Sequence, residues 1–390
     1  MYLSTYLTGT LVFAFSFIYL NIPSYAFETP SLEPKYVYYV FALLIAPLML
    51  FKFRKLVFYM ASPFSLWVLA EITVNSFGLL YGSQDVVHMV MTRIQYLTMA
   101  LMFGFAASIA SSTASYEGIF RILAITIPVL IFIDFIRPGI FYPPDALGSV
   151  IGRAAATFIN PTMAGEAMLV TCLLAIPITR LQYRMPLLLL TGAGVIMTFS
   201  RGPILVWLLF SIFLLVARKL PKYSFVLAII AVVFLPLLLT IFKSYLLERQ
   251  DLDAGASNIF ARLDFFQTHS LNDNSAQERL SVLKAGWEIF LENPILGGGA
   301  GITNFKTNLW PYEVNTHNQI VMLAAEQGIL GIALWAWLLV LLWRGKYFQD
   351  KRFQMVAAVG VFLMSFFTNN MMDMLYWTVS FALVSGRRQA

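Results

Sequence analysis

Residues 317–343, HNQIVMLAAEQGILGIALWAWLLVLLW, decide the fold class of this chain. Glu326 is the only Asp, Glu, Lys or Arg among them. A helix that crosses a bilayer needs roughly 17–25 mainly apolar residues, so this stretch predicts a membrane-spanning helix. The composition agrees, because 59% of the 390 residues are hydrophobic and 12% are charged, whereas a soluble domain carries about 25% charged residues. The chain is therefore predicted to be an integral membrane protein.

Further apolar stretches predict an all-α polytopic membrane protein with about twelve transmembrane helices. Ser200-Arg201-Gly202-Pro203 interrupts one long apolar run, so we interpret residues 186–199 and 203–217 as two short helices, with one long kinked helix as the alternative. Asn160 and Pro161 predict the cap and the first residue of another helix. The predicted spans are 5–22, 36–51, 57–81, 88–110, 119–137, 163–180, 186–199, 203–217, 223–243, 317–343, 353–370 and 373–386.

The polar segment 244–316 divides the chain into three parts. Residues 1–243 hold the first nine predicted spans, residues 244–316 form a large loop outside the membrane, and residues 317–390 hold the last three spans. All the spans together form one predicted membrane domain.

Basic loops predict the orientation of the chain. Lys and Arg concentrate in the short cytoplasmic loops of membrane proteins, and one set of alternate loops here is strongly basic. We therefore place this set, and with it both chain termini, in the cytoplasm. The loop 244–316 then faces outward, which in a bacterial cell is the periplasm. The basic residues of these loops are Lys52, Arg54, Lys55, Arg121, Arg180, Arg184, Arg218, Lys219, Lys222, Arg344, Lys346, Lys351, Arg352, Arg387 and Arg388.

The composition also excludes several kinds of site. Cys172 is the only cysteine, so neither an intramolecular disulfide nor a cysteine-rich zinc site is expected. The three histidines, His88, His269 and His317, contain no His-x-x-x-His pair, so we predict no bound metal and no other cofactor. The net charge of +6 matches the basic cytoplasmic loops and does not point to nucleic acid.

The outward loop contains a predicted amphipathic helix at 278–290. Leu280, Leu283, Trp287 and Phe290 recur in it at helical spacing, which is typical of a helix that lies on the membrane face. Asn293-Pro294 ends this helix. The glycine cluster 297–301 is not followed by Gly-Lys-Ser/Thr, so it predicts a close-packed turn and not a nucleotide-phosphate loop.

Ionisable residues fall near the outer ends of several predicted spans, among them Arg93, Asp134 and Glu326. Such residues are costly in a bilayer, so they line a polar cavity or pair with one another, and the sequence leaves both readings open. The outward arginines outnumber the nearby carboxylates, and a guanidinium binds phosphate oxygens in a bidentate manner. Arg153 and Arg201 lie beside helix starts, where backbone donors also suit an anion, so we predict that they can bind phosphate. A membrane enzyme whose substrate is a lipid-linked pyrophosphate would need such groups. Headgroup contact or a structural ion pair is the alternative for each arginine.

His317 stands where the polar loop re-enters the membrane. An imidazole with a pKa of about 6.5 can take a proton from a hydroxyl nucleophile at physiological pH. The alternative role is structural, in which His317 caps the following helix or bonds to the backbone.

Six motifs follow one another between residues 153 and 331. They are Arg153 to Pro161, Ser200-Arg201-Gly202, Arg279 to Trp287, Asn293-Pro294-Ile295-Leu296-Gly297 with Gly299 and Gly301, Thr316-His317-Asn318, and Glu326-Gln327-Gly328-Ile329-Leu330-Gly331. Each motif is loose, but their order resembles the signature of the O-antigen ligase and O-antigen polymerase superfamily. The predicted spans and the large outward loop fit the same family.

The resemblance implies a metal-independent glycosyltransferase of the GT-C membrane type, in the bacterial inner membrane. Its donor is a glycan on undecaprenyl pyrophosphate, and its active site is periplasmic. By motif position the family's essential residues correspond to His317, Arg279 and Arg201. His317 would deprotonate or orient the acceptor hydroxyl, and Arg201 and Arg279 would engage the pyrophosphate. Arg153 and Arg93 join the predicted pyrophosphate site on electrostatic grounds.

The acceptor separates the competing functions. A ligase transfers the glycan to a sugar of lipid A–core, whereas a polymerase transfers it to another lipid-linked glycan, and we favour the ligase. A single displacement by the acceptor hydroxyl would invert the anomeric centre. A twelve-span transporter is a third possibility, but the sequence shows no two similar halves of the kind that transporters contain.

Overall fold

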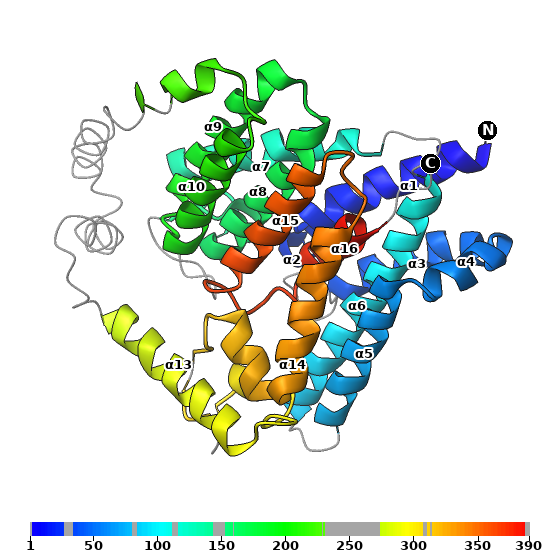
Figure 1. The fold of residues 1–390 in the computed structure, drawn as a ribbon, viewed down its shortest axis with the longest axis vertical. Coiled ribbons are helices and arrows are strands. Elements are labelled where there is room, and N and C mark those ends of the chain that lie inside the picture. Colours follow the sequence, from blue (N-terminus) through cyan, green and yellow to red (C-terminus); the bar gives the residue numbers. More distant parts are fainter. Residues whose placement is uncertain are drawn as a thin grey trace. The chain divides into compact units, whose positions relative to one another are not determined.

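The computed structural model describes residues 2–26, 34–79, 84–110, 116–142, 153–158, 160–227, 229–230, 274–306, 310–312 and 314–386. These residues form helices joined by turns, without a β-strand among them, which confirms the all-α prediction (Figure 1). Most of the predicted span 223–243 and the loop residues 244–273 lie outside the described residues.

The chain divides into two compact units. The first unit comprises Met1–Ile18, Phe27–Tyr116 and Asn274–Ala390, and the second comprises Tyr19–Ala26 and Glu117–Asp273. The predicted boundaries at residues 243 and 316 stay predictions.

Two helices organise the first unit. Helix α6 packs against α3, α5 and α16, and helix α14 packs against α5, α13, α15 and α16. Figure 1 shows α13 beside the first part of α14. The helices are α1 (Tyr2–Tyr19, whose last residue falls in the second unit), α3 (Pro34–Phe51), α4 (Phe53–Met60), α5 (Pro63–Gly78), α6 (Gln84–Ala110), α13 (Asn274–Glu292), η4 (Ile302–Asn304), α14 (Gln319–Arg344), α15 (Lys351–Met364) and α16 (Leu375–Ser385).

The second unit is built around one buried helix. Helix α8 contacts α7, α9 and α10, and 13 of its 15 residues are buried. It begins as the sequence predicts, with Pro161 first and the Asn160 side chain accepting a hydrogen bond from the Thr162 amide at 2.8 Å. The helices are α2 (Ile22–Ala26), α7 (Gly118–Ile136), η1 (Ala156–Phe158), α8 (Pro161–Ala175), η2 (Ile176–Ile178), α9 (Leu181–Met197) and α10 (Arg201–Val216).

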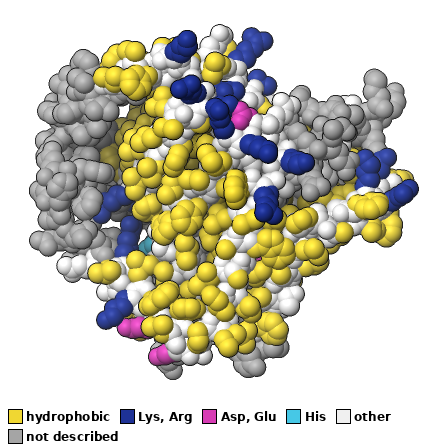
Figure 2. Space-filling view, in the orientation of Figure 1, with side chains coloured by type: hydrophobic (Ala, Val, Ile, Leu, Met, Phe, Trp, Pro, Cys, Tyr) yellow, Lys and Arg dark blue, Asp and Glu magenta, His cyan; other side chains and the backbone are white. Residues whose placement is uncertain are grey.

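Several helices are suited to a membrane. Among the residues that the structure describes, four segments are long and apolar enough to cross a membrane: Asp85–Ala110, Gly118–Ile136, Pro161–Ile178 and Gln319–Arg344. A fifth candidate joins Lys35–Phe51 to Phe53–Met60 across a bend of 105°, and four apolar helices are shorter. Apolar side chains cover much of the visible surface (Figure 2). The structure thus supports a multi-pass membrane protein, while the count of twelve spans stays a prediction.

Two predicted helix boundaries can be compared directly with the structure. The span 57–81 was placed too early, because α5 begins at Pro63 and Ser62 accepts a hydrogen bond from the Ser65 amide. A serine cap before proline is a helix-start signal that the apolar pattern hides. The run around Ser200 forms two helices, with Phe199 in the left-handed region (φ 48°) between them. The alternative of one kinked helix is wrong.

Helix α14 breaks at Gly328, which has φ 64° and ψ −148°. The break frees backbone groups within an apolar helix, and a nearby loop bonds them. The Gly298 and Gly299 amides donate to the carbonyls of Ala325 (2.7 Å) and Glu326 (3.1 Å), and the Ile329 amide donates to the Pro294 carbonyl (2.8 Å). Unbonded backbone groups at membrane depth cost several kcal/mol each, so the hydrogen bonds from this loop stabilise the broken helix.

The loop can approach the break because glycines lie on both sides of the contact. A Cβ at Gly297 would collide with the Glu326–Gln327 peptide, and one at Gly328 would lie 2.5 Å from the Ile295 carbonyl carbon. Gly297, Gly299 and Gly301 all have positive φ, at 70°, 109° and 83°. The predicted close-packed glycine turn is therefore confirmed, and its packing partner is the backbone of α14.

We expect Gly328→Ala to lower the free energy of unfolding by more than about 2 kcal/mol, because the new Cβ adds both backbone strain and a steric collision. The midpoint of thermal unfolding of the purified protein in detergent measures the change. Gly360→Ala in α15 is the matched control, since a Cβ there meets nothing within 4 Å. Equal midpoints for the two variants would contradict the proposed packing.

Candidate active site

Arg93 of α6 lies at the centre of a buried ion network. Its Nε and Nη2 donate to the two carboxylate oxygens of Asp373, at 2.7 and 3.1 Å. Its Nη1 donates to Glu326 Oε2 (3.0 Å) and to Asn75 Oδ1 (3.1 Å). The side chains of Arg93 and Glu326 are fully buried. Buried charges of this kind are tolerated only when they are paired and hydrogen-bonded, as they are here.

The second oxygen of Glu326 extends the network to the glycine turn. Glu326 Oε1 accepts hydrogen bonds from Thr303 Oγ1 (2.8 Å) and Asn304 Nδ2 (3.3 Å) in η4. The network thus joins α5, α6, η4, α14 and the connection between α15 and α16. For Glu326 and Arg93 the structure shows pairing, which was one of the two readings left open by the sequence.

The guanidinium of Arg93 is almost fully engaged by other residues of the protein. A guanidinium has five N–H donors, and the four hydrogen bonds to Asn75, Glu326 and Asp373 occupy four of them. Arg93 therefore holds two carboxylates in place. The sequence predicted that Arg93 binds pyrophosphate and did not predict this structural role. Asn75, Thr303, Asn304 and Asp373 were missed at the sequence level. The available signal was Arg93 itself, since a buried arginine in a span requires a carboxylate partner.

His317 precedes α14 and does not cap it. The cap is Asn318, whose Oδ1 accepts hydrogen bonds from the Ile320 and Val321 amides at 3.0 Å each. His317 has φ 48°, and its amide donates to Asn315 Oδ1 at 3.3 Å. Its ring nitrogens make no hydrogen bond to any residue that the structure describes. The capping alternative for His317 is therefore wrong, because Asn318 is the N-cap of α14.

The imidazole of His317 is held in its neutral form. Burial, and then the positive charge of Arg279, lower its pKa to about 4. Both causes act against the protonated ring, because burial removes water and a nearby cation repels the added charge. At pH 7 the ring is therefore neutral, and one of its two nitrogens is unprotonated. An unprotonated nitrogen can accept a proton, as a general base must.

Helix α13 carries Arg279 and packs closely on the segment that holds His317. Its buried residues Val282, Gly286 and Ile289 recur at helical spacing. A Cβ at Gly286 would lie 2.9 Å from Val321 Cγ1 and 3.2 Å from Thr316 Cγ2, so the close approach needs a glycine at this position.

The predicted amphipathic helix 278–290 is confirmed as α13, Asn274–Glu292. Leu280, Trp287 and Leu291 are exposed on it, whereas Leu283 and Phe290 are partly buried. Its contact with a membrane surface stays a prediction.

Arg153 joins two further motifs within the second unit. Its Nε donates to the Thr198 carbonyl (2.9 Å) and its Nη2 to Ser200 Oγ (2.6 Å), so it holds the turn that precedes Arg201. Arg201 is the first residue of α10, where unpaired backbone amides favour an anion. Asp134 Oδ2 accepts hydrogen bonds from the Ala155 and Ala156 amides at 2.8 Å each, which fixes the segment after Arg153.

The five predicted site residues fall into two groups. His317, Arg279 and Arg93 belong to the first unit, and Arg201 and Arg153 to the second. Arg279 acts electrostatically on His317, and Arg153 holds the turn beside Arg201. That all of them act on one substrate stays a prediction.

Apolar helices of spanning length, a buried ion network and a neutral histidine under the charge of an arginine define a polytopic membrane protein with a candidate polar active site. Residues 186–336 match the model of a protein family described as O-antigen ligase. This match confirms the resemblance over this part of the chain, which contains the last five of the six motifs. It includes Arg201, Arg279, His317 and Glu326. No match was found among curated proteins.

We expect Arg93→Met to lower the free energy of unfolding by about 3–5 kcal/mol, because it leaves two carboxylates without their cation. Adding Glu326→Gln should recover part of the loss by removing one of those charges. Thermal unfolding in detergent measures both changes. Lys284→Gln is the control: its ion pair with Glu288 spans 3.9 Å between exposed side chains, and such a pair contributes at most about 1 kcal/mol. An Arg93→Met protein as stable as the control would contradict the network.

We expect His317 to titrate near pH 4 in the folded protein, and Arg279→Gln to raise its pKa because a repelling charge is lost. Carbon-13 NMR of labelled histidine follows the titration, and His317→Asn identifies the signal. The unfolded state, with a histidine pKa of about 6.5, binds more protons between pH 6.5 and 4. The free energy of unfolding should therefore fall as the pH falls through this window. A wild-type midpoint near 6.5 would show that the imidazole is not held neutral.

Proposed function

We propose that this protein is a glycosyltransferase of the O-antigen ligase type, with His317 as its general base. The donor would be a glycan on undecaprenyl pyrophosphate, and the acceptor a sugar hydroxyl of lipid A–core. The family match supports the general function. The observation that carries the proposed site is the neutral, unbonded imidazole of His317 under the charge of Arg279.

The proposed reaction is one displacement at the anomeric carbon. The acceptor hydroxyl oxygen forms a bond to that carbon while the bond from the carbon to the pyrophosphate oxygen breaks. The leaving pyrophosphate keeps the electron pair, and His317 takes the hydroxyl proton. Attack opposite the leaving group inverts the anomeric centre. Arginines stabilise the charge that grows on the pyrophosphate, so this scheme uses electrostatics and alignment and no metal ion.

Donor binding would also strengthen the base. In the free protein the charge of Arg279 lowers the pKa of His317. A pyrophosphate bound to Arg279 brings negative charge close to the imidazole, which favours its protonated form. The proton affinity of His317 would then rise when the leaving group is in place.

The other three predicted residues have different roles in this proposal. Arg201, at the first turn of α10, binds the pyrophosphate together with Arg279. Arg153 adds positive charge there and orients the turn through Ser200. Arg93 supports the site indirectly, through Glu326 and the glycine turn.

We also propose how the chain is arranged in the membrane. Twelve spans of a GT-C-type fold would lie in the bacterial inner membrane, with both termini in the cytoplasm. The loop that ends at His317 would then lie in the periplasm, where the donor and lipid A–core meet. The alternation of basic loops supports this orientation.

Transfer by purified protein, from a defined undecaprenyl-pyrophosphate glycan to lipid A–core, tests the proposal. We expect His317→Ala to reduce the rate about 10²–10⁴-fold, as is usual for loss of a general base. Arg279→Ala and Arg201→Ala should each reduce it by at least about 10²-fold, the usual effect of losing one charge-stabilising donor. Arg279→Lys should restore only part of the rate, since lysine keeps the charge but loses the fork. Lys284→Ala, on the same helix as Arg279, should remain active.

Three outcomes would contradict parts of this proposal. Full activity of a folded His317→Ala protein would exclude the base role. Glycan lengthening on undecaprenyl pyrophosphate, with none on lipid A–core, would favour a polymerase. Movement of the donor across vesicles without release of undecaprenyl pyrophosphate would favour a transporter.

A further inference from the structure

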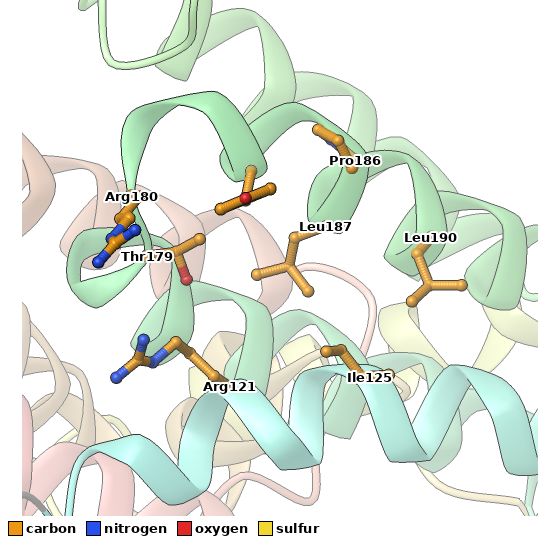
Figure 3. Close-up of a pocket in the computed structure, with 8 residues that line it drawn as sticks. Arg121, Ile125, Thr179, Arg180, Pro186, Leu187 and Leu190 are labelled. Carbon is orange, nitrogen blue, oxygen red and sulfur yellow. The ribbon is translucent and has the colours of Figure 1, made fainter.

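A pocket in the second unit has two chemically different ends. Its volume is about 550 Å³, and it lies between the start of α7 and the start of α9. Figure 3 shows Arg121 and Arg180 at one end and Ile125, Leu187 and Leu190 toward the other. A ligand that fills it must therefore combine an anionic group with an apolar chain.

The pocket lies where membrane helices end. Arg121 is in the first turn of the candidate span Gly118–Ile136, and Arg180 follows the end of the candidate span Pro161–Ile178. Tyr183, which also lines the pocket, is 55% exposed, and tyrosines gather at the level of lipid headgroups. Ile125 is 49% exposed, so the apolar end opens toward the outside of the unit, where lipid chains would lie.

The charges at the polar end are open to a ligand. Among the described residues, neither Arg121 nor Arg180 forms an ion pair or a side-chain hydrogen bond. A third arginine, Arg184, bonds the Thr179 and Lys219 carbonyls at 3.0 Å each and so holds the segment that carries Arg180. Glu117, the N-cap residue of α7, is an acidic residue one turn before Arg121. Arg121 and Arg180 are the charged residues that line the pocket, so its polar end is positive.

We propose that this pocket binds one anionic phospholipid. Its phosphate would lie between Arg121 and Arg180, and an acyl chain would follow Ile125, Leu187 and Leu190. Basic pockets between transmembrane helices are known to hold acidic headgroups. A free phosphate would leave the apolar end empty, and a zwitterionic lipid would bring its own cation to the two arginines. The proposal does not depend on the transferase reaction, since none of these residues is placed in that site.

The test measures lipid retained by the full-length protein. Wild-type protein in mixed micelles of phosphatidylglycerol and phosphatidylcholine is delipidated stepwise, and the bound lipid is counted by native mass spectrometry. We expect selective retention of phosphatidylglycerol, weakened roughly fivefold by Arg121→Gln or Arg180→Gln and roughly 25-fold by both. Arg344→Gln with Lys346→Gln removes the same charge from the first unit and should retain the lipid. Equal retention by the two double variants would overturn the proposal.

A second variant tests the apolar end while both arginines remain. Leu190→Trp fills the space of the chain, and we expect it to lose phosphatidylglycerol as the arginine variants do. Retention of the lipid by a folded Leu190→Trp protein would overturn the placement of the chain. Inorganic phosphate that displaces the lipid at millimolar concentration would show that the pocket recognises phosphate alone. Preference for undecaprenyl phosphate over phosphatidylglycerol would also contradict the proposal.

Discussion

A helix that breaks inside an apolar layer needs another part of the chain to bond its free backbone groups. In this protein the break of α14 at Gly328 is bonded by the amides of Gly298 and Gly299 and by the carbonyl of Pro294. The candidate active site depends on this contact, because the same loop joins α13, which carries Arg279, to η4. Glu326 reinforces the contact from its side chain, since one carboxylate oxygen binds Arg93 and the other binds Thr303.

The predicted site residues are distributed over the two units. The first unit holds the imidazole, the arginine that lowers its pKa and the ion network behind them. The second unit holds the Arg153-supported turn at the start of α10, and the family match extends across parts of both units. The predicted site residues are thus divided between the two units, and each unit holds its own part of the hydrogen-bonded framework around them.

The sequence predicted the helices well, because apolar length and helical spacing are local properties. Leu280, Leu283, Trp287 and Phe290 located α13 to within a few residues, and Asn160-Pro161 located the start of α8. It did not predict the break at Gly328, since a glycine in an apolar run gives no sign of its φ until the partner loop is known. Asp373 was missed for a similar reason: it lies 280 residues from Arg93 along the chain, and only the tertiary fold pairs them.

The backbone contact between the glycine turn and the break in α14 bears on how segments of this chain could be exchanged with those of similar proteins. The segment that precedes α14 is one such candidate for exchange. A graft that ends at Thr316 would bring in a foreign glycine turn but keep the native Glu326–Gly328 segment against which the native turn fits. The smallest transferable piece therefore runs from the start of α13 past Gly331, and it carries its own half of a membrane helix with it.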